Sequence, residues 1–120
     1  MNDKQMGVIE SRFADLIWEQ EPIPSPELAK QSEAVFGWKK STTYTVLKRL
    51  CDKGLFQNQK GVVTSLISRE EFYALQSERF VEETFRGSLP AFLAAFTAKK
   101  KLTAEEVALL RRMVDEYREE

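Results

Sequence analysis

The sequence predicts a mainly helical protein that carries one small β-hairpin. Apolar residues recur at helical spacing in six segments, glycine and proline residues separate these segments, and one stretch near the middle is rich in strand-forming residues. Of the 120 residues, 42% are hydrophobic and 31% are charged, which is ordinary for a globular protein. We therefore expect one domain, or one domain with an appendage, long enough to bury a core.

The first segment with helical periodicity covers residues 8–20 and ends before Pro22. Its apolar residues follow the i, i+4, i+7, i+8 pattern of a helix with one buried face. The residues expected on that face are Ile9, Phe13, Leu16 and Ile17.

A proline-rich connector leads from the first helix to the second. Pro22 and Pro24 each disfavour helix in the preceding residue, so the connector should be extended. Ser25 is expected to cap the second helix, with Pro26 at the first helical position.

The second helix should run to about residue 36. We expect Leu28 and Val35 to point inward and Gly37 to end the helix. A short link through Gly37 then leads into the next helix.

The stretch from Trp38 to Gly54 predicts a third helix with two different faces. Ser41 and Thr42 are favourable at a helix start, and Gly54 suits the turn after a helix end. At 100° per residue, the packing side collects Thr43, Val46, Leu47, Leu50 and Cys51. The opposite side and the residues just before it carry hydroxyls and cations: Lys39, Lys40, Ser41, Thr42, Thr45, Lys48 and Arg49.

Basic residues are concentrated around this third helix. The whole chain has a net charge of −1 and a pI of about 5.7. Residues 38–60 carry six cations against Asp52 alone, a net charge of +5, so the remainder of the chain carries −6. A basic patch on an acidic body orients a protein on a polyanion. By itself, this pattern also fits an ordinary solvated surface helix, a helix on a membrane surface, or a helix in the groove of a partner protein. The neighbouring segments distinguish these interpretations.

A hairpin is expected directly after the third helix. Residues 55–57 and 62–67 are rich in strand formers, and they flank a four-residue turn over 58–61 that ends in Gly61. Three helices followed by a hairpin describe a winged helix-turn-helix fold. In such a fold Lys60 would lie against the phosphate backbone, although a purely structural hairpin is an equal alternative.

Three further helices are expected after the hairpin. Ser68 begins a capping box for a helix over 69–86 that ends at Gly87, and Ser88 with Pro90 begins the next helix. Thr103 begins a second capping box, for a helix that runs to about residue 118. We expect Phe72 and Leu75 among the apolar residues of the first of these helices.

The last fifty residues carry more apolar surface than three short helices can bury. Each large side chain left exposed forfeits roughly 1.5–3 kcal/mol. We therefore expect a homodimer, with an intramolecular core as the alternative. The residues expected in the dimer interface, called here the C-terminal apolar set, are Phe80, Phe85, Leu89, Phe92, Leu93, Phe96, Val107, Leu110, Met113 and Val114.

Several classes of function are disfavoured by the composition. The chain has no histidine and one cysteine, Cys51, so His-based triads, the usual zinc sites and an internal disulfide are excluded. We expect no catalytic residues, no metal and no cofactor, and Cys51 is expected to be a buried structural thiol. The absence of a long apolar run and of a signal-peptide pattern predicts a cytoplasmic protein without membrane insertion.

The run WKKSTTYTVLKRLCDKGL, from Trp38 to Leu55, closely resembles the corresponding segment of the penicillinase and methicillin-resistance repressors, a family related to copper-responsive repressors. Residues 14–18 resemble the end of that family's first helix. The hairpin, the helix after Ser68 and the helix that begins at residues 102–106 match its later part in order and length.

The resemblance implies a dimeric winged-helix repressor on double-stranded operator DNA in promoters of antibiotic-resistance genes. It also implies relief of repression by a membrane sensor-protease system, which leads to cleavage in the fifth helix. The family's cleaved pair is typically Asn-Phe, and the matching candidate pair here is Ala95 and Phe96. No cysteine follows Cys51, which excludes the copper-cluster mechanism of the related branch. The wing carries Val62, rather than arginine, after its glycine.

The favoured hypothesis is a homodimeric, sequence-specific DNA-binding repressor on a palindromic operator. We expect a DNA-binding domain over residues 1–68 and a dimerisation region over 69–120. Thr42, Thr45 and Arg49 are expected to approach base edges, and Lys39, Lys40 and Lys60 to contact phosphates. The alternative is a winged-helix module that binds protein without direct DNA contact.

Overall fold

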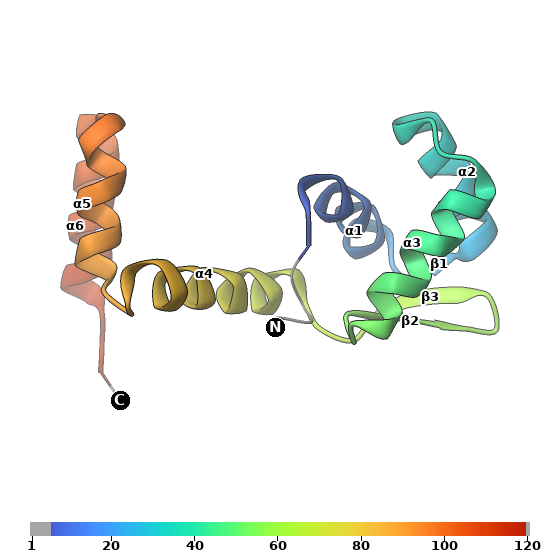
Figure 1. Cartoon of the computed structure of the whole chain (residues 1–120). Coiled ribbons are helices and arrows are strands. Elements are labelled where there is room, and N and C mark those ends of the chain that lie inside the picture. Colours follow the sequence, from blue (N-terminus) through green and yellow to red (C-terminus); the bar gives the residue numbers. More distant parts are fainter. Residues whose placement is uncertain (1–5, 120) are drawn as a thin grey trace. The chain divides into compact units, whose positions relative to one another are not determined.

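A computed structural model describes residues 6–119 and confirms the predicted fold class. In order along the chain, its elements are α1 (Val8–Gln20), β1 (Ile23–Pro24), α2 (Ser25–Phe36), α3 (Lys40–Asp52), β2 (Phe56–Gln59), β3 (Val62–Ser65), α4 (Arg69–Phe85), α5 (Leu89–Lys99) and α6 (Ala104–Glu116) (Figure 1). The chain forms two compact units that divide between Gln76 and Ser77, inside α4. The sequence-based division at 68/69 lies before the start of the same helix.

The first unit holds a hydrophobic core between three helices and a small sheet. Helix α2 packs on α1 and α3, α3 packs on β2, and α1 packs on β3. Figure 1 shows the β2–β3 hairpin beside α3. The buried residues that form the core are Phe13, Ala14, Ile17, Ile23, Leu28, Val46, Leu47, Leu50, Leu55, Phe56, Val63 and Phe72. Burial of each large side chain contributes roughly 1.5–3 kcal/mol, so this core holds the unit together.

The sheet contains a strand that the sequence did not predict. Strand β1 pairs antiparallel with β3, with Ile23 opposite Val63, so the strand order is β1-β3-β2. The connector around Pro22 and Pro24 is extended as expected, but two residues are too few for a period-two pattern. The Ser25 N–H donates to the Gly61 carbonyl oxygen at 2.8 Å and links the connector to the tip of the hairpin.

The hairpin turn is shorter than predicted. The four-residue turn over 58–61 was wrong, because β2 continues to Gln59 and β3 begins at Val62. Only Lys60 and Gly61 form the turn, with φ of 53° and 81°. Two consecutive residues at positive φ make the tight turn whose twist matches paired strands. The expected strand over 62–67 was also too long, since β3 ends at Ser65.

Helix α2 ends at Phe36 as predicted and begins one residue earlier than predicted, at Ser25. The Ser25 cap was wrong: no side chain caps this helix, and the buried Ser25 hydroxyl accepts a hydrogen bond from the Tyr44 hydroxyl at 3.2 Å. Gly37 ends the helix at φ 71°, as predicted. Leu28 is buried, but Val35 is 61% exposed, so its predicted inward position was wrong. The next residue, Phe36, packs against the core in its place, so Val35 lies on the outer side of this last turn.

Two smaller corrections concern α1 and α3. Ile9 is 48% exposed instead of buried, because it lies in the first turn of α1, while Phe13 and Ile17 are fully buried as expected. Helix α3 begins at Lys40 with Lys39 at the cap position and no capping side chain, so Ser41 lies inside the helix.

Cys51 was predicted to be buried and is only half-buried. Burial, followed by the charge of Asp52, raises the pKa of the Cys51 thiol, while Lys48 acts in the opposite direction. A thiol that stays protonated is a packing group and a poor nucleophile.

The second unit lacks a buried core among its described residues. None of the side chains over 77–119 is buried. The predicted helix starts are confirmed: Ser88 Oγ accepts from the Ala91 N–H, and Thr103 and Glu106 form a reciprocal capping box at 2.8 and 3.0 Å. Helix α6 ends at Glu116, two residues earlier than predicted.

Phenylalanine rings join α4 to α5 in this unit, through Phe92 of α5. Phe92 lies 6.0 Å from Phe80 and 5.6 Å from Phe85, both edge to face, and 6.1 Å from Phe96. Such pairs contribute about 0.5–1.5 kcal/mol each beyond burial. Within α4, only Phe72 is buried; Leu75 is 41% exposed, which corrects its expected packing.

Candidate nucleic-acid interface

Helix α3 separates its apolar and polar faces as the sequence predicts. Thr43, Val46, Leu47 and Leu50 are buried against the core. The outward side chains, called here the polar face of α3, are all exposed: Lys40, Ser41, Thr42, Thr45, Lys48 and Arg49. The core therefore holds the helix from behind and leaves its hydroxyls and cations accessible.

The Thr45 hydroxyl on this face already donates a hydrogen bond within the helix. The Thr45 hydroxyl donates to the Ser41 carbonyl oxygen at 2.9 Å, so its own oxygen remains an acceptor for an outside donor. This bond also fixes the Thr45 rotamer and turns its methyl group to a defined position. A methyl and an acceptor side by side can distinguish one base edge from another.

Three cations of the α3 region form ion pairs that hydrophobic patterning did not reveal. Lys48 Nζ lies 3.2 Å from Asp52 Oδ2, one helical turn ahead. Arg49 Nη1 lies 3.0 Å from Glu10 Oε2, and Lys53 Nζ lies 3.7 Å from Glu10 Oε1. The i, i+4 spacing signals the first pair. No sequence signal links Glu10 to Arg49, 39 residues away.

Glu10 is held firmly from its own helix as well. It is the third residue of α1, and its Oε1 accepts from the Gly7 N–H at 3.2 Å. Partial burial by itself raises the pKa of the Glu10 carboxyl. The Gly7 N–H, the Arg49 guanidinium and the nearby Lys53 charge outweigh that effect and hold the pKa below its ordinary value of 4.5. Glu10 is therefore ionised at neutral pH.

The remaining predicted phosphate contacts lie on the surface in two places. Lys39 and Lys40 are exposed at the start of α3, and Lys60 is exposed in the hairpin turn. None of the three forms an ion pair with any residue in the described part of the chain. Their charges are thus available to an outside anion.

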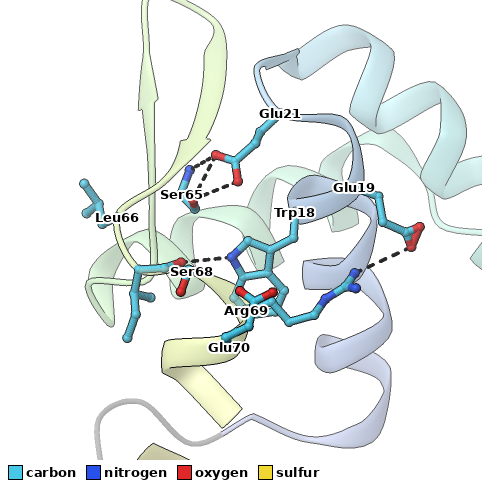
Figure 2. Close-up of a pocket in the computed structure, with 9 residues that line it drawn as sticks. Trp18, Glu19, Glu21, Ser65, Leu66, Ser68, Arg69 and Glu70 are labelled. Carbon is cyan, nitrogen blue, oxygen red and sulfur yellow. Dashed lines mark hydrogen bonds and ion pairs between the residues drawn. The ribbon is translucent and has the colours of Figure 1, made fainter. Parts of the chain in front are cut away.

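A polar junction between α1, β3 and α4 fixes the hairpin in the first unit. Trp18 Nε1 donates to the Ile67 carbonyl oxygen at 2.9 Å, and the Glu21 carboxylate accepts from the Ser65 N–H at 2.7 Å and from its hydroxyl at 2.8 Å (Figure 2). Arg69 pairs with Asp15 at 3.2 Å and with Glu19 at 3.6 Å.

The junction borders an open depression of about 380 Å³. Figure 2 shows the Glu21 carboxylate turned toward Ser65 and the Arg69 guanidinium turned toward Glu19. The central carbon of that guanidinium lies 6.0 Å from the centre of the Trp18 ring. Because these groups pair with one another within the fold, we interpret the junction as a structural brace for the hairpin.

Residues 6–119 also lack a metal-binding cluster and a membrane-spanning helix. No group of three or more His, Cys, Asp or Glu residues there is arranged to hold a metal ion. Over the same residues, every helix is too short or too polar to cross a bilayer.

The fold is a winged helix-turn-helix: helices α1 to α3 are followed by the β2–β3 hairpin, and the polar face of α3 is exposed. The chain belongs to the penicillinase repressor family, whose sequence profile matches residues 6–116. It is 25% identical over 118 residues to the penicillinase repressor of Bacillus licheniformis, an alignment that covers 95% of this chain and 92% of that protein. Family membership makes the chain a transcriptional repressor, and so a regulatory protein.

Proposed function

We propose that this protein is a homodimeric repressor that binds a palindromic operator in double-stranded DNA through the polar face of α3. The observation that carries the proposal is the exposure of this face on a helix whose opposite side is anchored in the core. An α-helix fits the major groove, where hydroxyls and cations meet base edges and phosphates.

The side chains take different roles in this proposal. Thr42 and Thr45 lie in the first half of α3, the part of a helix in this fold that enters the groove most deeply, and they contact base edges. Arg49 contacts a base edge further along the helix. Lys39, Lys40 and Lys60 contact phosphates; Ser41 and Lys48 complete the surface.

A salt series on the purified protein tests direct DNA binding. The probe is the tightest-binding duplex recovered from a randomised pool, followed by fluorescence anisotropy. Three phosphate-contacting lysines in each of two subunits predict a slope of roughly −5 in log affinity against log salt, at about 0.9 per phosphate. A flat salt response, or a pool that yields no preferred duplex, would contradict the proposal.

The second unit supports the homodimer in this proposal. In the C-terminal apolar set, Phe80, Leu89, Phe96, Met113 and Val114 are 46–74% exposed. Surface of this kind is typical of an interface. Two copies related by a two-fold axis would cover it and present two α3 helices to two half-sites about one helical turn, or a multiple of it, apart.

Relief of repression by proteolysis is the regulatory part of the proposal. Ala95 and Phe96 lie within α5 and are both exposed, and Phe96 belongs to the C-terminal apolar set. A cut there would remove α6 from the interface and so weaken DNA binding. We propose an antibiotic-resistance gene or a related stress gene as the target. A gene for a membrane metalloprotease next to this one would support both points.

A protein-binding winged-helix module is the second candidate, because the same exposed apolar residues would also suit a helical partner. Apolar association responds weakly to salt, so the salt series separates the two candidates.

A further inference from the structure

The ion pair between Glu10 and Arg49 joins the start of α1 to the polar face of α3. The Glu10 side chain is 17% exposed, whereas Arg49 is 53% exposed. The pair therefore consists of a fixed, mostly covered carboxylate and a guanidinium that still reaches the surface. We propose that Glu10 is a positioning residue that makes Arg49 discriminate between operator and unrelated DNA, an inference that rests on the proposed function.

The carboxylate cannot follow Arg49 if the guanidinium moves. Its Oε1 accepts from the Gly7 N–H at 3.2 Å and lies 3.7 Å from Lys53 Nζ, and its Oε2 takes Arg49 Nη1 at 3.0 Å. Groups at the start of α1 and on or just after α3 therefore hold both oxygens of the carboxylate in place. Glu10 fixes one end of a side chain that would otherwise sample many rotamers.

Arg49 retains donors for DNA while it is held. A guanidinium has five N–H donors, and the hydrogen bond to Glu10 uses one nitrogen. The others remain available in a fork whose direction is set by Glu10. A duplex with an acceptor at that position gains the contact without reorganising the side chain.

Unrelated DNA gains less from the same arginine. Binding without sequence preference depends on cations that follow the phosphates wherever they lie. Glu10 opposes this. A phosphate that does not lie where the held guanidinium points must compete for Arg49 with the Glu10 carboxylate, which is also negatively charged. The structure thus disfavours loose electrostatic contacts more than the matched contact.

Glu10→Gln tests the inference, because the amide keeps an oxygen for the Gly7 N–H and removes the charge. Freed Arg49 should gain about one phosphate per subunit on a scrambled duplex. At about 0.1 M salt this strengthens binding of the dimer roughly sixtyfold, about eightfold per subunit, and steepens its salt slope by about 1.8. Affinity for the selected duplex should change less than about twofold, so the ratio of the two affinities should fall roughly thirtyfold.

Glu70→Gln is the matched control. Glu70 is exposed in the first turn of α4, and the substitution changes net charge by the same amount. It should alter affinity for the two duplexes equally. Equal changes in Glu10→Gln, or no change on either duplex, would overturn the inference while leaving DNA binding by the wild type intact. A wild type that fails the salt series would remove the proposed function itself.

A double-mutant cycle shows whether Glu10 acts through Arg49. In an Arg49→Ala background, Glu10→Gln should no longer lower the affinity ratio. A full effect in that background would overturn the positioning role. If Glu10→Gln melts too early for binding work, Glu10→Asp replaces it, because its shorter carboxylate withdraws from the Arg49 guanidinium. The affinity ratio should again fall, and an unchanged ratio would overturn the inference.

Discussion

Arg49 is the residue on which sequence preference depends most directly. Arg49→Ala should cost roughly 1–3 kcal/mol on the selected duplex and relax preference at one position of the site, as expected for a bidentate base contact. Selection from a randomised pool with wild type and variant measures both. Equal loss on selected and scrambled DNA would identify Arg49 as a simple phosphate contact.

The ionisation of Glu10 links stability to pH. The pKa of Glu10 is lower in the folded chain than its ordinary value of 4.5, so the folded state favours the ionised form. Its contribution to the free energy of unfolding is therefore present above that value and is lost as the pH falls through the lower folded pKa. Glu10→Gln should be less stable than the wild type at pH 7, and the difference in stability should be smaller at pH 3.

Urea unfolding at both pH values measures this difference. Since the junction around Arg69 also contains carboxylates, the informative quantity is the wild type minus the variant at each pH. A difference that stays constant with pH would show that the Glu10 pairing contributes nothing to folding.

Among the elements, the hairpin turn contributes both a backbone conformation and the charge of Lys60, and single substitutions can separate these two roles. Lys60 holds φ of 53° in the turn, where an L-residue costs roughly 1–2 kcal/mol. Lys60→Gly relieves this strain but raises the conformational entropy of the unfolded chain. The two effects oppose each other, so stability should change by less than about 1 kcal/mol. DNA affinity should nevertheless fall equally on all sequences, with a salt slope shallower by about 1.8 for a dimer.

Gly61→Ala is the complementary change. Gly61 has φ of 81°, and an added Cβ would meet only Ser25 Oγ at 4.0 Å, so the effect is backbone strain without a clash. It should lower stability by about 1–2 kcal/mol and leave the salt slope unchanged. Thermal melts beside the binding series measure both variants. A Lys60→Gly protein with an unchanged slope would exclude the hairpin from DNA contact.

The helices were predictable because each combines periodic apolar residues with a local end signal. Phe13 and Ile17 mark the inner face of α1, Gly37 ends α2, and Thr103 with Glu106 starts α6. Such signals are local in sequence. Strand β1 was missed because its two residues become a strand only when β3 lies beside them.

The candidate site was predictable in its surface and not in its contacts. Periodicity alone places Thr42, Thr45 and Arg49 on the outside of α3. The Glu10 partner of Arg49 depends on how α1 crosses α3 in three dimensions, and no pattern within either helix contains that information. Ser25 was misassigned for a similar reason, since its hydroxyl accepts a hydrogen bond from the Tyr44 hydroxyl across the α2–α3 contact.

At the scale of the whole molecule, the exposed apolar residues of the second unit lead us to predict how a substitution there changes dimerisation. Val114 is 74% exposed in the single chain and belongs to the C-terminal apolar set. Val114→Asp would place an unpaired charge in each half of the interface, a cost of about 3 kcal/mol or more, so the dissociation constant of the dimer should rise more than a hundredfold. Sedimentation equilibrium measures it.

Val35→Asp is the control for this experiment. Val35 is 61% exposed in the first unit, so the same chemical change lies outside the proposed interface and should leave assembly unchanged. Dimers of Val114→Asp as stable as those of the wild type would show that this end of α6 takes no part in the interface.

The most direct test of DNA recognition by α3 is to follow the backbone amide signals of the labelled protein by NMR while the selected duplex is added in dilute salt. We expect the largest shifts on residues 39–49 and on the turn at Lys60 and Gly61, with saturation at one dimer per duplex. Shifts confined to α5 and α6, or signals that do not respond to the duplex, would contradict DNA recognition by α3.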